Sequence, residues 1–248
     1  MCTLILLYRP EHPWPLLLAG NRDELRDRPA LPPARHWEDR PEVVAGLDRL
    51  AGGSWLGVTD QGLAAAVMNR QGSLGPAAGK RSRGELVLEA LEQGAAATAA
   101  ESLRALEPRA YRPFNLVVAD PLGAYWLRHD ASGPIQARAI DPGLHMLSAG
   151  ELDDASDPRI AAFLPRFRAA EVPDPERGDW HAWQTLLAER DPPAGAPAGA
   201  AMNLDFPDGL CTRSTGLLAL PRYPGFGARP RFWFADGAPD RARFEVVL

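Results

Sequence analysis

The order of strand-like and helix-like segments is the feature that most restricts the fold of this 248-residue chain. Apolar runs typical of β-strands come first, a helical stretch follows, strands return, and further helices precede a strand-rich end. Runs of strands followed by runs of helices are typical of layered α+β domains, whereas strands that alternate singly with helices build parallel sheets. We therefore predict a layered α+β fold.

The first strands form a predicted hairpin. TLILLY (residues 3–8) and PLLLAG (15–20) flank RPEHPWP, whose prolines exclude a helix. We expect a loop rich in charge and proline over residues 21–42. A second hairpin should follow, with its turn at residues 60–62 (DQG), where glycine can adopt a positive φ.

Helical signals begin at Ser82, which with Glu85 matches a capping box, and Gly94 is expected to end or break this helix. Two more helices are predicted near residues 157–170 and 179–190. The segment at 191–201 (DPPAGAPAGAA) is typical of a flexible loop. Three closing strands are expected beyond it, in CTRSTGLLAL, RFWFAD and FEVVL.

Composition excludes several classes of protein. The net charge of −5, with no basic stripe, argues against nucleic-acid binding. No apolar run approaches the roughly 20 residues that span a bilayer, and the short runs near the start do not match a signal peptide. Cys2 and Cys211 form neither a disulfide framework nor metal-ligand spacing, and the histidines are scattered. We expect a cytoplasmic protein without membrane insertion or a dedicated metal site.

Cys2 is the residue that most directly suggests chemistry, because removal of Met1 would make it the first residue of the mature chain. It would then combine a thiol of reference pKa about 8.5 with an α-amine near 7.7–8.0. A terminal amine can activate an adjacent thiol without a histidine. The alternative is a cysteine that serves as a small buried apolar group.

The string AGNRDELRDRPA supplies candidate partners for Cys2. A hairpin brings Asn21, Arg22, Asp23 and Glu24 beside the start of the first strand. Arg22 could then favour the thiolate, and Asp23 could orient the α-ammonium as part of a fixed Arg–Asp pair. The alternative interpretation is a solvated charged loop.

Three further residues are candidates at strand ends. Asn69 ends the strand LAAAVMN and could donate a hydrogen bond to an oxyanion, although asparagine is also common in turns. Asn115 opens FNLVVAD as a possible donor or a strand-edge polar residue. Arg213, in CTRSTG, could bind a substrate acid or lie at the surface.

Together, MCT, GNRDE, GGSWLGV, GLAAAVMNR, RPFNLVVAD and CTRSTGLLAL resemble the NRDE family, also called the transport and Golgi organisation family. The resemblance covers nearly all of residues 1–248, which implies a single domain. The family is similar in turn to N-terminal-nucleophile (Ntn) hydrolases with a cysteine nucleophile. This similarity implies a four-layer αββα sandwich, in which helices flank two stacked, largely antiparallel sheets.

The resemblance also implies roles for individual residues. Cys2 would be the nucleophile with its α-amine as base, Arg22 and Asp23 the supporting pair, and Asn69 an oxyanion donor. The remaining candidates would bind substrate: Asn21, Asn115 and Arg213. HMLSAGELDD lacks the asparagine expected after its serine, and DPR replaces an expected WPK at 157–159; we expect both changes at the rim of the pocket.

The expected activity is that of a cysteine amidohydrolase or acyltransferase acting on an amide or thioester of a hydrophobic acyl group. No cofactor is required for that chemistry. The alternative implied by the family is a carrier of haem, with acyl-CoA or lipid binding without turnover as a third possibility. In each case the expected partner is a small hydrophobic ligand or acyl substrate.

Overall fold

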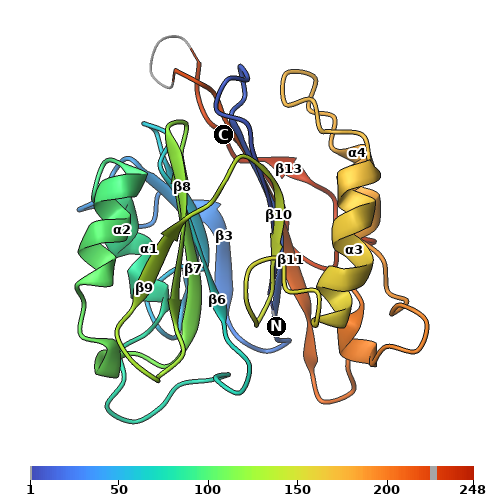
Figure 1. Cartoon of the computed structure of the whole chain (residues 1–248), viewed down its shortest axis with the longest axis horizontal. Helices are drawn as coiled ribbons and strands as arrows, with labels where there is room; N and C mark the ends of the chain where they lie inside the picture. The colour runs from blue at the N-terminus through green and yellow to red at the C-terminus, as the bar shows by residue number, and fades with distance from the viewer. Residues whose placement is uncertain (1, 224–227) are drawn as a thin grey trace.

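Two antiparallel sheets lie face to face in this computed structural model, which describes residues 2–223 and 228–248. Figure 1 shows that a pair of helices covers the outer face of each sheet. The predicted α+β class and the four-layer αββα arrangement are therefore confirmed.

The first sheet has the strand order β10-β1-β2-β11-β12-β13. Its strands are β1 (Thr3–Tyr8), β2 (Leu16–Leu25), β10 (Gly143–Leu147), β11 (Leu210–Leu220), β12 (Arg231–Ala235) and β13 (Glu245–Val246). The predicted hairpin of residues 3–8 and 15–20 is confirmed as β1 and β2. The loop predicted over 21–42 is partly wrong, because β2 continues to Leu25 by pairing with β11 on its other side.

The second sheet has the strand order β3-β4-β5-β6-β7-β8-β9. Its strands are β3 (Ala30–Ala34), β4 (Val43–Asp48), β5 (Leu56–Thr59), β6 (Ala64–Asn69), β7 (Phe114–Asp120), β8 (Gly123–His129) and β9 (Gln136–Ala139). The predicted turn between β5 and β6 is present, and Gly62 adopts a φ of 83° there.

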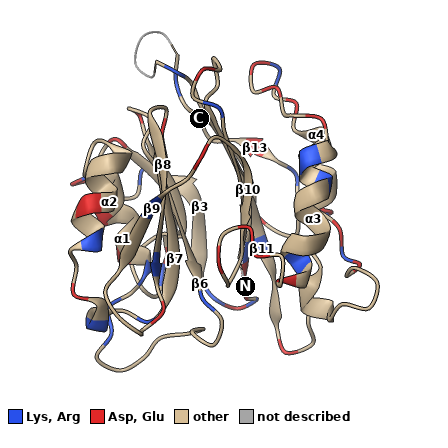
Figure 2. Cartoon of the chain, in the orientation of Figure 1, with Lys and Arg blue, Asp and Glu red and all other residues tan. Residues whose placement is uncertain are grey.

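Residue alternation along the strands divides the core into three layers. In β2, Leu16 and Leu18 face the opposite sheet, whereas Leu17 and Ala19 face the helices. Successive strand residues point to opposite faces, so each apolar strand contributes to two layers. Charged residues accordingly lie mainly outside the facing strands (Figure 2).

Four α-helices cover the sheets: α1 (Gly84–Leu91) and α2 (Ala96–Arg104) pack on the second sheet, and α3 (Pro158–Ala169) and α4 (His181–Leu187) pack on the first. At the start of α1, the Ser82 amide donates to Glu85, and the Ser82 hydroxyl accepts from the Gly84 amide. Gly94 has a φ of 74° between α1 and α2, where the sequence predicted a break. Asp157 caps α3 through the Arg159 amide, and Pro158 occupies the first turn.

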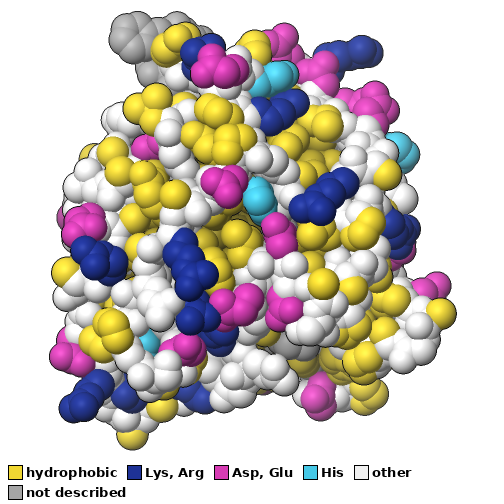
Figure 3. Space-filling model, viewed as in Figure 1, with side chains coloured by type: hydrophobic (Ala, Val, Ile, Leu, Met, Phe, Trp, Pro, Cys, Tyr) yellow, Lys and Arg dark blue, Asp and Glu magenta, His cyan; other side chains and the backbone are white. Residues whose placement is uncertain are grey.

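The segment at 191–201 contains one short 3₁₀ turn, at Ala198–Ala200, and its predicted flexibility stays a prediction. Within the described ranges, no helix is long and apolar enough to cross a bilayer. Basic and acidic side chains are intermixed on the face shown in Figure 3.

Candidate active site

The β1–β2 hairpin places Cys2 opposite Arg22. Thr3 pairs with Asn21 in antiparallel register, so Cys2, just before β1, lies opposite Arg22 in β2. Alternation directs Cys2 and Arg22 towards the second sheet, whereas Thr3, Asn21 and Asp23 point towards the helices. The structure thus brings Cys2 beside residues 21–24, as predicted, but the side chains of these residues alternate between the two faces of the first sheet.

The Cys2 thiol lies half-buried at the edge of the inter-sheet core and donates to the main-chain oxygen of Asp23 over 3.9 Å. Burial raises the pKa of the thiol above its ordinary value, while the positive charge of Arg22 acts in the opposite direction. The effect of burial is the larger one. A neighbouring base would therefore help to ionise this thiol.

Arg22 is 6% exposed and lies over the indole of Trp55, with its guanidinium carbon 4.2 Å from the ring centroid. Its Nη2 atom lies 4.0 Å from Glu24 and 3.9 Å from Asp48. The indole can approach β4 because Gly46 has no side chain: a Cβ there would lie 2.3 Å from the ring. This packing holds the guanidinium in place beside Cys2.

Asp23 is fully buried on the opposite face of the sheet. Its carboxylate accepts a hydrogen bond of 2.7 Å from Thr212 and lies 3.5 Å from Arg159. Burial raises the pKa of this carboxyl, and the charge of Arg159 opposes that shift. The expected direct pair of Arg22 and Asp23 is therefore wrong, since each has its own partners of opposite charge on its own face.

Arg159 was missed as a site residue, and its expected place at the rim is wrong. It is 1% exposed, donates to Thr3 and binds the Gly199 carbonyl over 2.6 Å. The first turn of α3, begun by Asp157 and Pro158, directs the side chain inward behind β1 and β2. The DPR string was its only visible signal.

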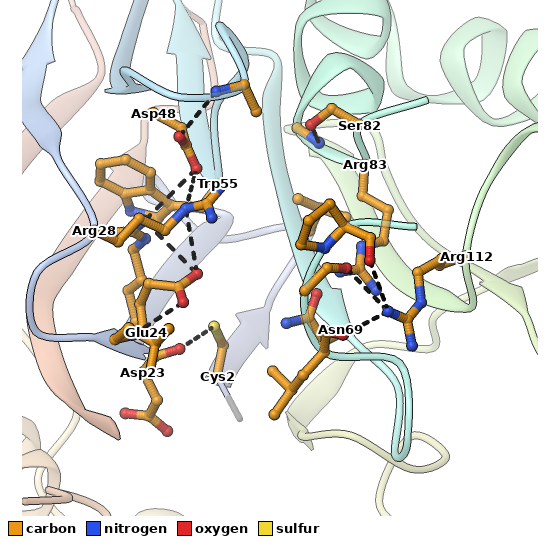
Figure 4. Close-up of a pocket in the computed structure, with 18 of the residues that line it drawn as sticks. Cys2, Asp23, Glu24, Arg28, Asp48, Trp55, Asn69, Ser82, Arg83 and Arg112 are labelled. Atoms are coloured by element: carbon orange, nitrogen blue, oxygen red, sulfur yellow. Dashed lines mark hydrogen bonds and ion pairs between the residues drawn. The ribbon is translucent and has the colours of Figure 1, made fainter. Parts of the chain in front are cut away.

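A cavity of about 530 Å³ opens beside the Cys2 thiol. Asn69, at the end of β6, faces Cys2 from the opposite wall (Figure 4). The side chains of Cys2, Arg22 and Asn69 thus line one cavity, whereas Asp23 meets the thiol through its main-chain oxygen and keeps its carboxylate on the other face. Other lining residues were missed as site residues: Glu24, Arg28, Asp48, Trp55, Leu74, Pro76, Lys80, Arg83 and Arg112.

Asn21 and Asn115 are not arranged to contact a substrate in this cavity. The Asn21 amide donates to the carbonyls of Leu187 and Met202, each over 2.9 Å, and accepts from Thr215. Its side chain therefore holds the helical layer against the first sheet. A substrate-binding role for Asn21 is not supported by this geometry.

The Asn115 side chain joins the two sheets. It donates to the carbonyls of Ser148 and Gly150 over 3.0 and 2.8 Å and accepts from Arg70 over 2.8 Å. Trp126 also donates to its oxygen. With its amide occupied in this way and completely buried, Asn115 fits a structural role better than the predicted substrate contact.

Arg213 lies outside the Cys2 cavity. The register of β11 shifts between Thr212 and Ser214, and the Arg213 side chain donates to the Arg26 carbonyl over 2.5 Å. It lines a separate recess of about 310 Å³ that also contains Cys211. The structure does not bring Arg213 to the predicted substrate site. No group of three or more potential acidic, histidine or cysteine metal ligands occurs in the described part of the chain.

Comparison with known proteins agrees with this arrangement. Residues 1–171 match the family Transport and Golgi organisation 2. The chain belongs to this family. Its curated relatives include the Transport and Golgi organization protein 2 homologs of Bos taurus, 35% identical over 129 residues, and Homo sapiens, 34% identical over 128 residues. Each match covers 48% of this chain and 45% of the relative, so it spans less than half of those proteins.

Solved structures show the same fold. The Caenorhabditis elegans ortholog of N-acylethanolamine-hydrolyzing acid amidase superposes with a TM-score of 0.57 at 12% identity, over 90% of this chain and 94% of the amidase. A variant of the conjugated bile acid hydrolase from Clostridium perfringens gives a TM-score of 0.50 at 11% identity, over 99% and 96%. These similarities show that this protein has an Ntn-hydrolase-like fold.

Proposed function

We propose that this protein is a cysteine amidohydrolase or acyltransferase that cleaves an amide or thioester of a hydrophobic acyl group. The observation that carries the proposal is the position of the Cys2 thiol on the wall of a cavity, opposite the side chain of Asn69. Trp55, Val67 and Leu74 supply apolar lining for an acyl group. The fold shared with two amide hydrolases supports the proposal by analogy.

The chemistry begins with removal of Met1, which frees the α-amine of Cys2. This amine takes the thiol proton, and the sulfur attacks the carbonyl carbon of the substrate. The Asn69 amide donates to the oxygen that becomes negatively charged. When the carbon–nitrogen or carbon–sulfur bond breaks, the α-ammonium returns the proton to the leaving group. Water, or another acceptor, then attacks the thioester and releases the acyl group.

Arg22 and Asp23 support this reaction from the two faces of β2. Arg22 opposes the effect of burial on the Cys2 pKa, so it increases the fraction of thiolate. The main-chain oxygen of Asp23 orients the thiol. The Asp23 carboxylate fixes the hairpin end through Thr212 and Arg159. Asp23 is thus proposed as a positioning residue.

The test is a panel of decanoyl amides and thioesters assayed with the wild-type protein, Cys2→Ser, Asn69→Ala and Cys211→Ser. Intact mass first establishes whether Met1 is removed. We expect loss of turnover with Cys2→Ser, a decrease of about 10²–10³-fold with Asn69→Ala, and little change with the control Cys211→Ser. Retention of Met1, or equal rates for wild type and Cys2→Ser on every substrate, would refute the mechanism.

Haem carriage is the competing proposal, because the arginines of the cavity could bind the propionates and Cys2 could ligate the iron. A haem titration of wild type and Cys2→Ala distinguishes the two functions. A Cys2-dependent Soret shift at micromolar haem would favour the haem carrier. Binding of an acyl ligand without turnover would favour the lipid-binding alternative.

A further inference from the structure

The two walls of the cavity differ in how their charges are compensated. On the wall that carries Cys2, Arg28 binds Asp48 over 2.7 Å, and Arg22 lies near both Asp48 and Glu24. Two guanidinium groups therefore face two carboxylates. This wall is close to neutral, and Figure 4 shows its ion pairs as a connected group.

The opposite wall carries Lys80, Arg83 and Arg112, which contact main-chain oxygens instead. Lys80 donates to the Arg109 carbonyl over 2.5 Å. Arg83 donates to the carbonyls of Ser73 and Pro113, and Arg112 to four carbonyls of the loop at 72–76. No carboxylate of the described residues lies within ion-pair distance of these three cations, whereas neighbouring Arg81 pairs with Glu85 and Glu89.

Carbonyl oxygens satisfy hydrogen-bond donors but do not neutralise charge. Arg83 and Arg112 are both half-buried and repel each other, and burial followed by this repulsion lowers the pKa of Arg83 to about 10. Part of the cost of confining these charges would be removed by an anion between them. Asp208, also at the cavity edge, accepts from the Leu210 amide on the far side.

We propose that Lys80, Arg83 and Arg112 bind an anionic group of the substrate, a carboxylate or a phosphate. This inference rests on the proposed function, because that function places the scissile bond of the substrate at Cys2. Arg83 and Cys2 line the same cavity from its two walls, so the cationic wall faces the reacting sulfur (Figure 4). The acyl group lies in the cavity against Trp55 and Val67, beside Cys2, and the leaving group carries the negative charge.

Binding to the Cys2→Ala protein tests this assignment without requiring turnover. The first probe pair is N-decanoylglycine and the neutral N-decanoylglycinamide, which differ in one charge on the leaving group. The second pair is decyl phosphate and decanol. Isothermal titration should show at least about a tenfold preference for the anion in one pair or both. The pair with the larger preference identifies carboxylate or phosphate as the natural group.

The preference should decrease several-fold when Lys80→Gln or Arg83→Gln is added to Cys2→Ala, and it should decrease with salt. Lys80 is exposed, so its replacement should leave folding intact even if Arg83→Gln disturbs the loop. The control is Arg138→Gln, an exposed arginine on β9 away from the cavity. Equal binding within both pairs, or an anion preference that survives Lys80→Gln in a folded protein, would overturn the inference. Retained anion preference with no wild-type turnover would refute only the proposed hydrolysis.

Discussion

The guanidinium of Arg159 lies 3.5 Å from the carboxylate of Asp23, although 136 residues separate the two in sequence. Both side chains are almost completely removed from water. Because a charge buried without its partner is costly, we predict that Arg159→Leu lowers the free energy of unfolding by about 3–5 kcal/mol. Urea denaturation measures this change.

Arg166→Gln is the matched control for that variant. Arg166 lies on the same helix and pairs with Glu189, but its side chain is 46% exposed. An exposed ion pair contributes about 1 kcal/mol or less, so stability should change little. Equal losses of unfolding free energy in Arg159→Leu and Arg166→Gln would show that burial does not strengthen the contact between Arg159 and Asp23.

The pKa of the Cys2 thiol provides a second prediction. Burial raises it, and the Arg22 charge limits the increase, so Arg22→Gln should move the alkylation midpoint of Cys2 to still higher pH. Arg22→Lys retains the charge and should remain closer to wild type. The pH dependence of iodoacetamide labelling, followed at Cys2 by peptide mass, measures the midpoints. A midpoint unchanged in Arg22→Gln would contradict the electrostatic role of Arg22.

Asn69 and Asn115 should respond differently to replacement by alanine. Asn115→Ala removes the buried hydrogen bonds of Asn115 to Arg70, Trp126 and the carbonyls of Ser148 and Gly150, so we expect a loss of stability of at least about 2 kcal/mol. Asn69→Ala removes a cavity-facing amide and should change stability by less than about 1 kcal/mol. Thermal and urea unfolding distinguish the two residues. The assignment of Asn115 to a structural role fails if the two variants are equally stable.

The pair of His145 and Asp153 should make stability depend on pH. The hydrogen bond to Asp153, 2.6 Å long, raises the pKa of His145, with burial acting against it. The pKa of Asp153 is lowered despite burial, because His145 and the Met146 amide donate to it. A histidine pKa that is higher in the folded state stabilises the fold at low pH, and this contribution is lost as pH rises through the folded value.

The difference in unfolding free energy between wild type and His145→Gln should therefore be larger at pH 5.5 than at pH 8.5. Asp153, whose pKa is lowered, stays ionised across this range, so the change belongs to His145. Urea denaturation at both pH values measures the difference. His181→Gln, at an exposed position, serves as the control for replacing a histidine.

Local patterns in the chain were sufficient for most strands, both helical regions and the α+β class. TLILLY and PLLLAG predicted β1 and β2, and Gly62 and Gly94 marked a turn and a helix break correctly, because such features depend on neighbouring residues. The same predicted hairpin places Cys2 beside Arg22, as the pairing of Thr3 with Asn21 confirms. The length of β2 was underestimated, since its charged end is stabilised as a strand by distant β11.

The partners of each site residue depended on packing between segments that are remote in sequence. Alternation along β2 sends Arg22 to Trp55 and Asp48 in the second sheet, and Asp23 to Thr212 and Arg159 under the helices. The contrast between the neutral and cationic cavity walls likewise arises where β2 and β4 face the loop before α1. Sheet stacking and helix docking set those distances, and no local run of residues encodes them. Residue types and strand parity thus defined the available chemical groups, whereas long-range packing selected the ones that meet at Cys2.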